Sequence, residues 1–250
     1  MKKILLVLLL SFGLIGCSSI NVPSIKLSSL ALSTTSPSDI QTDKILALGL
    51  SHDQNLVEAR KIADPNIASA VVKELNNRIL EAENKRLEME NILKYSEMVK
   101  VSDDNLKFTG SKISDTKSRN FVGKAENLDY FLLGFKDNNS GLTQHKLNFS
   151  ITYTSDERRN YSSANYCDKW NRCDNENQMD VTLIAIKASG CSSFDCDYNE
   201  IVELDLSDSF LKENMEQGLS MDFNSKASIS SRVSIPSSYI KGYLKVANKF

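Results

Sequence analysis

Hydrophobic residues recur every three or four positions between Pro65 and about Met98, and no glycine or further proline interrupts this stretch. The spacing predicts a long helix with a heptad seam of about four repeats. Asp64 is the predicted N-cap of this helix, and Pro65 suits its first turn. A shorter helix is predicted over residues 55–63. The seam positions are Ala68, Val72, Leu75, Ile79, Ala82, Arg86, Met89, Leu93 and Ser96.

Two interpretations of this seam remain open. It is either a coiled coil that self-associates or binds a partner helix, or the apolar face of a helix that packs on its own domain or pairs with residues 40–63. Arg86 lies within the seam, whereas Leu80 and Leu87 lie beside it and widen the apolar face beyond a narrow dimer stripe. These departures slightly favour packing within the chain.

After Val101 the pattern changes to a period of two. Residues 147–153 alternate apolar and polar side chains, which predicts a half-buried strand. Residues 128–135 predict a more fully buried strand, and Asp137–Gly141 between them has the composition of a hairpin turn. Further strands are predicted at 181–187 and 201–206, around Met221 and Phe223, and over 227–235.

The chain ends in a helical pattern after Pro236. Its apolar positions share one face, so the helix is expected to cover one end of the sheet. These positions are Tyr239, Ile240, Tyr243, Leu244 and Ala247. Together the patterns predict an α+β fold, with an N-terminal helical segment, an antiparallel β-sandwich-like or open-barrel domain, and a C-terminal helix.

The first residues, MKKILLVLLLSFGLIGCSSI, combine a basic start with an apolar run from Ile4 to Ile15. A run of about twelve residues is shorter than the roughly twenty that span a bilayer. This arrangement is typical of a secretory signal peptide. Its end, Leu14-Ile15-Gly16-Cys17, resembles the lipobox of bacterial lipoproteins, and the resemblance covers residues 1–18 only.

The resemblance implies that residues 1–16 are removed and that Cys17 carries the lipid, with a diacylglyceryl group on its thiol and an acyl chain on the new amino terminus. Ser18 stands where inner-membrane lipoproteins of the enteric type usually carry aspartate, which favours the outer membrane. The Ser/Thr/Pro-rich residues 17–42 are then expected to be a lipidated flexible tether. A helical segment over 43–100 and a disulfide-stapled β domain over 101–250 complete the predicted organisation.

Export would place Cys167, Cys173, Cys191 and Cys196 in an oxidising compartment, where thiols pair. Pairing within each loop, 167 with 173 and 191 with 196, is favoured over the crossed pairings, because each pair brackets a short polar loop. A zinc site is the alternative, but the five- and four-residue gaps and the distant histidines fit it poorly. Trp170, inside the first loop, is either a lid over the sheet or a contact residue.

Candidate catalytic groups are scarce. His52 and His145 are the only histidines, and each is expected to be a surface or strand residue and not a catalyst. Asp174, Glu176 and Asp180 resemble a loose calcium loop but lack the glycine and glutamate of an EF-hand, so a solvated loop without metal is predicted. Arg158 and Arg159 are interpreted as a charge pair at a strand end, with contact to an anionic glycan or lipid as the alternative.

The charge balance of the chain argues against nucleic-acid binding. Without the signal, 28 basic and 32 acidic residues remain, with no basic stripe of the kind that nucleic acid requires. The sequence therefore predicts a lipid-anchored envelope protein with a structural, adaptor or binding role, without enzyme activity or cofactor. Its predicted partners are the membrane and another envelope protein or a second copy. An envelope hydrolase acting on peptidoglycan or glycan, and a small-ligand or ion carrier, are the alternatives.

Overall fold

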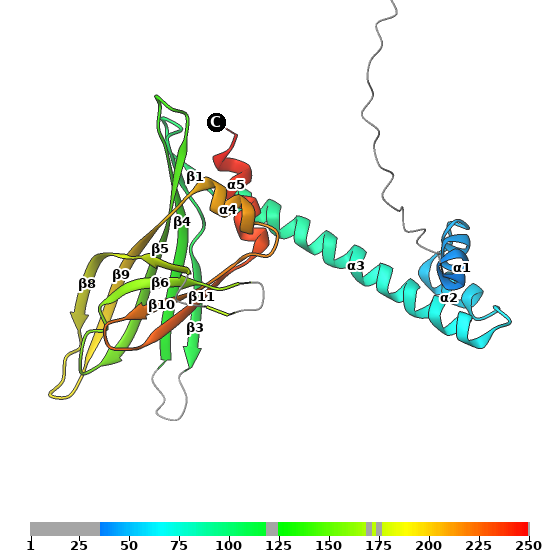
Figure 1. The fold of residues 1–250 in the computed structure, drawn as a ribbon, viewed down its shortest axis with the longest axis horizontal. Helices are drawn as coiled ribbons and strands as arrows, with labels where there is room; N and C mark the ends of the chain where they lie inside the picture. Colours follow the sequence, from blue (N-terminus) through cyan, green and yellow to red (C-terminus); the bar gives the residue numbers. More distant parts are fainter. Residues whose placement is uncertain (1–35, 119–124, 169–171, 174–176, 250) are drawn as a thin grey trace, which may run out of the picture. The chain divides into compact units, whose positions relative to one another are not determined.

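The computed structural model describes residues 36–118, 125–168, 172–173 and 177–249. The chain divides into two compact units, one ending at Leu75 and the other beginning at Asn76. Helix α3 (Pro65–Glu97) contributes residues to both (Figure 1). The predicted signal peptide and the lipobox lie outside the described residues.

The described part of the first unit consists of α1 (Pro37–Leu46), α2 (His52–Ala59) and the beginning of α3. Capping boxes start the first two helices. The hydroxyls of Ser36 and Ser51 each accept a bond from the amide of the third helical residue, and their own backbone amides donate to the side chain of that residue. A small core joins the three helices. Its buried residues are Ile45, Ala59, Val71 and Leu75.

Helix α1 begins within the range that the sequence assigns to the tether, so residues 37–42 are helical. Its start signal is local, since Ser36, Pro37 and Asp39 supply a cap, a first-turn proline and a capping carboxylate. Helix α2 spans 52–59 rather than the predicted 55–63. At α3 the prediction is confirmed, because the Asp64 carboxylate accepts bonds from the amides of Asn66 and Ile67 at 2.8 and 3.3 Å.

In the second unit the described strands form two sheets, in which all strand pairs are antiparallel. The larger has the order β1-β2-β4-β5-β9-β8, and β3 also pairs with β4. Its strands are β1 (Lys100–Val101), β2 (Lys107–Thr109), β3 (Ile113–Ser118), β4 (Ala125–Lys136), β5 (Thr143–Ser155), β8 (Thr182–Ser189) and β9 (Cys196–Leu206). The smaller has the order β11-β10-β6-β7. Its strands are β6 (Tyr161–Tyr166), β7 (Gln178–Asp180), β10 (Leu219–Ser225) and β11 (Ser230–Ile235).

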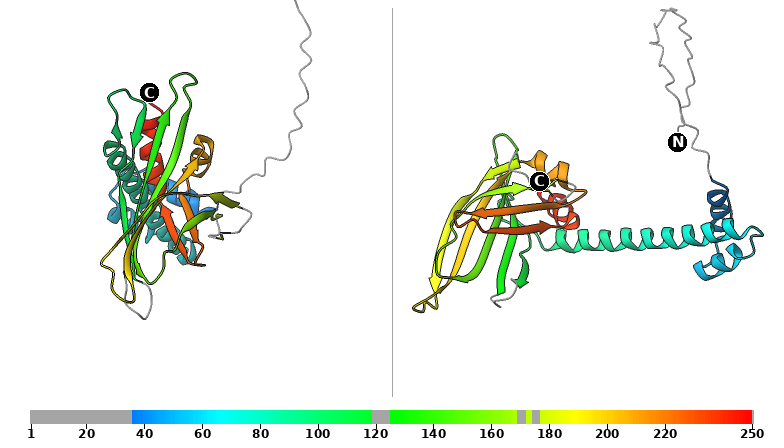
Figure 2. Two further views of the ribbon diagram at one scale, coloured as in Figure 1. Left: turned by 90° about the vertical axis from the view of Figure 1, so that its left-hand side faces the viewer. Right: turned by 60° about the horizontal axis from the view of Figure 1, so that its bottom comes forward.

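The two sheets face each other across one core and are not closed into a barrel (Figure 2). Phe149 of β5 and Phe223 of β10 stack across the layers with ring centroids 4.3 Å apart. Tyr161 meets Phe149 edge to face at 6.0 Å. Both geometries are favourable for aromatic rings, so this cluster holds the two sheets together.

Helix α5 (Ser237–Ala247) covers one end of the core, as its apolar face predicts. Two of its tyrosines also make hydrogen bonds to the larger sheet. The Tyr239 hydroxyl accepts from the amide of Leu132 at 3.0 Å and donates to the carbonyl of Ser111 at 2.8 Å. The Tyr243 hydroxyl lies 2.9 Å from Nδ1 of His145. These bonds satisfy the polar ends of buried aromatic residues.

The other side of α5 packs on the last turns of α3. A Cβ atom at Gly242 would lie 2.8 Å from both the carbonyl oxygen of Ile92 and Cβ of Tyr95. Only glycine therefore permits this approach. Nearby, Nζ of Lys241 contacts the Glu88 carboxylate at 2.7 Å, and the rings of Tyr95 and Tyr239 meet edge to face.

The predicted α+β class is confirmed, with antiparallel sheets between N-terminal helices and a C-terminal helix. The predicted strand over 147–153 is part of β5, and its four apolar residues are all buried. Several elements were not predicted, among them β6 and the short helix α4 (Asp208–Asn214). Tyr161 and Ala164 in β6 are separated by Ser162 and Ser163, which masks the alternation.

Replacing the central ring with a small side chain should destabilise the β domain. We expect Phe149→Ala to lower the free energy of unfolding by about 3–5 kcal/mol, because it removes a fully buried aromatic residue and leaves a cavity. Phe194→Ala is the matched control, since Phe194 is 86% exposed, and it should change stability by less than about 0.5 kcal/mol. Urea unfolding of the disulfide-intact chain measures both, and equal effects would contradict the assignment of the core.

Candidate functional site

The structure pairs the cysteines within each loop. Cys167 is bonded to Cys173, and Cys191 to Cys196. The first disulfide closes the segment after β6, and the second closes the loop that joins β8 to β9. Both pairs agree with the favoured pattern. Because the sulfurs are bonded to each other, they do not offer the thiolates that a zinc site requires.

Within the described residues, one group has donor atoms close enough to share a metal ion, namely Cys167, Cys173 and Asp222. Its two sulfurs form the first disulfide. The Asp222 carboxylate is already held by Arg232, whose Nε and Nη2 lie 2.7 Å from its two oxygens. The same guanidinium contacts Sγ of Cys173 at 3.1 Å. This cluster therefore fixes the disulfide to β10 and β11 and does not fit a cation.

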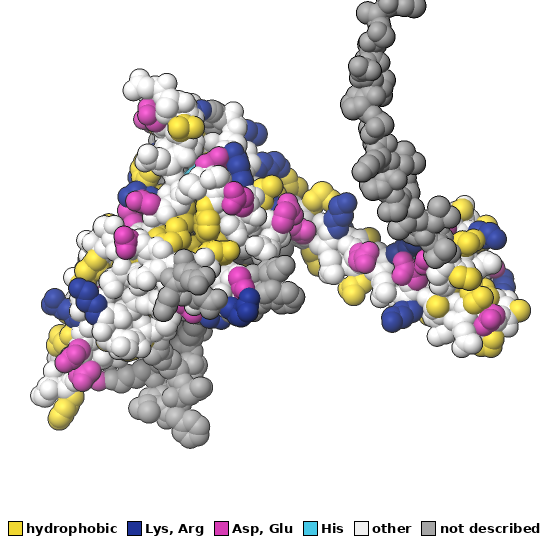
Figure 3. Space-filling model, viewed as in Figure 1, with side chains coloured by type: hydrophobic (Ala, Val, Ile, Leu, Met, Phe, Trp, Pro, Cys, Tyr) yellow, Lys and Arg dark blue, Asp and Glu magenta, His cyan; other side chains and the backbone are white. Residues whose placement is uncertain are grey.

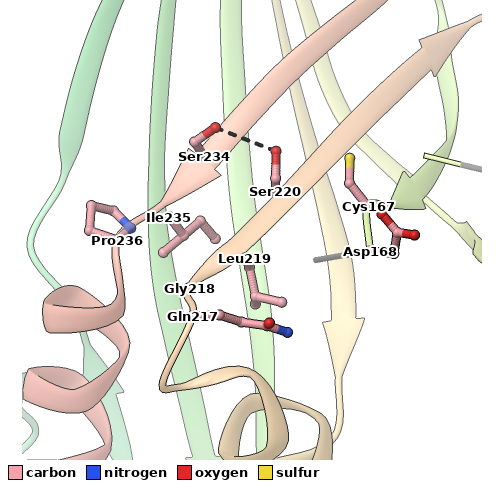
Figure 4. A pocket seen from close by; sticks show the side chains of 9 residues that line it. All are labelled: Cys167, Asp168, Gln217, Gly218, Leu219, Ser220, Ser234, Ile235 and Pro236. Atoms are coloured by element: carbon pink, nitrogen blue, oxygen red, sulfur yellow. Dashed lines mark hydrogen bonds between the residues drawn. The ribbon is translucent and has the colours of Figure 1, made fainter. Parts of the chain in front are cut away.

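A shallow pocket of about 380 Å³ lies beside this disulfide (Figure 4). Ser220 and Ser234 line it from neighbouring strands, and their hydroxyls are 3.5 Å apart. Asp168 lines it too, but its carboxylate holds the Arg172 guanidinium at 2.8 Å. Among the described residues, neither histidine nor lysine lines this pocket.

A second pocket, of about 550 Å³, is lined by Asp137 and Asp208. The pKa of Asp137 is lowered by hydrogen bonds from the amide of Asn139 and the hydroxyl of Ser140. Burial raises the pKa of Asp208, but hydrogen bonds to Lys212 and His145 outweigh it, so that this pKa is lowered as well. Both carboxyls are therefore ionised at neutral pH, whereas a glycoside hydrolase needs one of its pair protonated.

His145, which the sequence predicts to be a surface or strand residue, lies in β5 and is buried. Its Nε2 lies 3.3 Å from the Asp208 carboxylate, and its Nδ1 faces the Tyr243 hydroxyl. Burial lowers the pKa of His145 more than Asp208 raises it, and the imidazole is therefore neutral at pH 7. Neutral imidazole donates from Nε2 to Asp208 and accepts from Tyr243, so its hydrogen bonds join α4, β5 and α5.

A buried polar cluster at the end of β5 was not predicted. The Glu200 carboxylate accepts bonds from three consecutive amides, those of Arg159, Asn160 and Tyr161, at 2.9, 3.0 and 3.2 Å. The Arg159 side chain, interpreted from the sequence as part of a charge pair at a strand end, is buried against Glu126 at 2.5 Å. This arrangement pairs the buried charges and satisfies the three amides, while Nε of Arg159 has no hydrogen-bond partner among the described residues. It fixes the turn between the two sheets and leaves Arg159 inaccessible to a glycan or lipid.

Several large apolar side chains along α3 are exposed. Ile79, Met89 and Leu93 of the seam are 46%, 54% and 49% exposed, and charged side chains lie among them (Figure 3). Seam positions earlier in the helix behave differently, since Leu75 is buried in the core of the first unit. Packing within the chain, the interpretation favoured from the sequence, is thus confirmed for Leu75, whereas the seam residues Ile79, Met89 and Leu93 are not covered by the described part of the chain. Residues on another face, Glu88, Ile92 and Tyr95, contact α5.

Arg86 lies in the middle of this exposed stretch and is paired with two acidic residues of its own helix. Its guanidinium lies 2.6 Å from Glu83 and also bonds to Glu90. The pKa of Glu83 is lowered, mainly by its hydrogen bond with Arg86. The positive charge of Arg86, the one cationic residue of the seam, is therefore compensated by Glu83 and Glu90.

Several predicted residues lie outside the described ranges, namely Cys17, Trp170, Asp174 and Glu176. Of the loose calcium loop, Asp180 is exposed in β7. His52 begins α2.

Within the part of the chain that the structure describes, every helix is too short or too polar to cross a membrane. Comparison with protein-family models, with curated proteins and with solved structures finds no match.

The buried imidazole predicts a pH dependence of stability. Because the pKa of His145 is lower in the folded chain than its usual 6.5, the unfolded chain binds more protons just below that value. The free energy of unfolding should therefore fall as pH drops from 7.5 to 5.5, by at most about 1.4 kcal/mol per pH unit for this one group. The Asp208 contribution is lost only at more acidic pH, because the pKa of Asp208 is lowered from 3.8.

Urea unfolding across this pH range provides the measurement. His145→Gln should be less stable at pH 7.5 but should lose most of the slope, whereas His52→Gln is the matched control and should keep it. An unchanged slope in His145→Gln would show that another group carries the dependence.

Proposed function

We propose that this protein is a cell-envelope lipoprotein, anchored by lipid on Cys17 and most consistent with the outer membrane, that serves as a structural or adaptor component by binding another envelope protein or a second copy. The observation that carries the proposal is the sequence Leu14-Ile15-Gly16-Cys17 after a short apolar run. A lipidated cysteine at this point would tether the folded units to a bilayer surface, where two or more acyl chains give stable attachment.

The disulfides support export. Two cysteine pairs lie at bonding distance, and disulfides persist in compartments outside the reducing cytoplasm. A bacterial envelope beyond the inner membrane is such a compartment. The remaining cysteine of the chain, Cys17, is then the one available for lipid.

The binding role is supported by α3. A helix of 33 residues extends about 50 Å, and its middle turns expose large apolar side chains that the described part of the chain does not cover. Exposed apolar surface bordered by charged residues is typical of a protein interaction site. Such a surface suits a protein that joins components of the envelope.

The two alternative functions receive less support. A hydrolase with acid–base carboxylates would require a carboxyl group with a raised pKa, and both acidic residues of the second pocket have lowered values. A carrier would require a large apolar cavity between the sheets. The described core is filled instead by close-packed aromatic and aliphatic side chains. Binding at the surface of α3 is therefore the function we adopt.

Lipidation is tested by expressing the full chain in a bacterium that processes lipoproteins and measuring the intact mass of the product. We expect a chain that begins at Cys17 and carries three acyl chains, recovered with the membranes. Cys17→Ser should be recovered without lipid and with the soluble envelope fraction. Its four other cysteines should still be disulfide-bonded. An unmodified Cys17 in a cytoplasmic chain with free thiols would contradict the proposal.

A further inference from the structure

We infer that the partner of the exposed α3 face is a second copy of this chain, bound in parallel through a two-stranded coiled coil over residues 78–93. This inference rests on the proposed function, because the lipid anchor sets the orientation of the two copies. It adds the identity of the partner and the register of the contact.

The exposed seam has the spacing of heptad core positions. Ile79, Arg86 and Leu93 occupy successive a positions, and Ala82 and Met89 occupy the d positions between them. All five are exposed in the single chain. The stretch from Ile79 to Leu93 is about 22 Å long, enough for two heptads of knobs-into-holes contacts.

The flanking charges select both the partner and its direction. Arg78 and Lys85 occupy g positions, and Glu83 and Glu90 occupy e positions. In a parallel pair, a residue at g faces the e residue five positions later on the other helix, so Lys85 meets Glu90 and Arg78 meets Glu83. In an antiparallel pair, g faces g and e faces e, which places like charges opposite each other. The chain is therefore complementary to itself in the parallel direction.

Arg86 is compatible with this contact despite its position in the core. Glu83 and Glu90 of its own helix pair with its guanidinium. The two Arg86 side chains of a dimer therefore meet at this layer without uncompensated positive charge. A polar residue at a single a position generally fixes register at some cost in stability. Here it would align the two helices residue for residue, because any shift by one heptad places Arg86 against Ile79 or Leu93.

The lipid anchor favours the same direction. Two chains that are attached to one bilayer by their amino termini can bring equivalent helix residues together in parallel without one chain reversing. Confinement to the surface also raises the effective concentration, which matters because two heptads alone give weak association. Charge pattern and anchoring thus agree independently on a parallel pair.

Crosslinking of the lipidated chain in native membranes tests the register. We introduce Ala82→Cys at a d position and, as the matched control, Asn84→Cys at the f position on the opposite face. Under mild oxidation, Ala82→Cys should form a covalent dimer and Asn84→Cys should not. Absence of a dimer from Ala82→Cys, or equal dimer from both variants, would overturn the inference. Both sites are exposed, so neither change should affect folding.

A charge exchange tests the direction. In the Ala82→Cys background, Lys85→Glu or Glu90→Lys alone places like charges opposite each other twice per dimer, and each should weaken association about tenfold. When differently tagged copies of the two variants are co-expressed, both contacts become attractive again and the mixed dimer should recover. If the mixed pair crosslinks no better than either variant alone, the parallel g-to-e contact is wrong.

The outcomes separate this inference from the proposed function. If the Ala82→Cys thiol crosslinks only to a different envelope protein, the second copy is the wrong partner, while lipid-anchored binding stands. If the wild-type chain dimerises through this seam but lacks lipid on Cys17, the proposed anchor is wrong, whereas the coiled coil stands on its charge pattern alone.

Discussion

The close approach between α5 and α3 at Gly242 determines which face of the long helix remains exposed. A side chain at this position would collide with the backbone of Ile92 and with Tyr95. Because α5 also buries Tyr239 and Tyr243 against the larger sheet, α3 is packed on the same helix that covers the β core. The contact uses one face of α3 and turns its heptad seam away from the β domain.

This division of faces explains why α3 has two apolar patterns. Ile92, Tyr95 and Val99 recur at spacings of three and four. Tyr95 and Val99 pack against the β core and the backbone of Ile92 lies against α5, while Ile79, Met89 and Leu93 follow the seam and remain exposed. The polar contacts agree with this division. Lys241 holds Glu88 on the packed side, whereas Glu83 and Glu90 flank the seam and hold Arg86. One helix thus belongs to the fold of its own chain and presents a binding surface on a different side.

Much of this fold follows from the sequence, because its signals are local. Alternation in residues 147–153, the cap at Asp64 and the helical face from Tyr239 to Ala247 each depend on neighbouring residues, and the structure confirms them. The pairing of the cysteines within each loop was also predictable, since short loops bring their ends together. Helix α1 had a readable capping box at Ser36, which was missed because the surrounding composition resembled a tether.

Features that depend on distant residues were not predictable. Nothing near Arg159 in the sequence indicates that Glu126 and Glu200, from two other strands, will bury it. The exposure of the seam was not predictable for the same reason, because it depends on where the distant helix α5 packs on α3. Periodicity identified the seam residues but not which of them the chain itself would cover.

Oxidation of two methionines in intact envelopes tests most directly whether the seam is a binding surface. Met89 lies in the seam and Met98 outside it, and their exposures in the single chain are similar, at 54% and 46%. With dilute peroxide, both should form sulfoxides at comparable rates in the isolated Cys17→Ser chain. In envelopes that contain the wild-type protein, Met89 should be protected while Met98 remains reactive. Equal oxidation of the two residues in the envelope would show that the seam is bare there and would contradict the account.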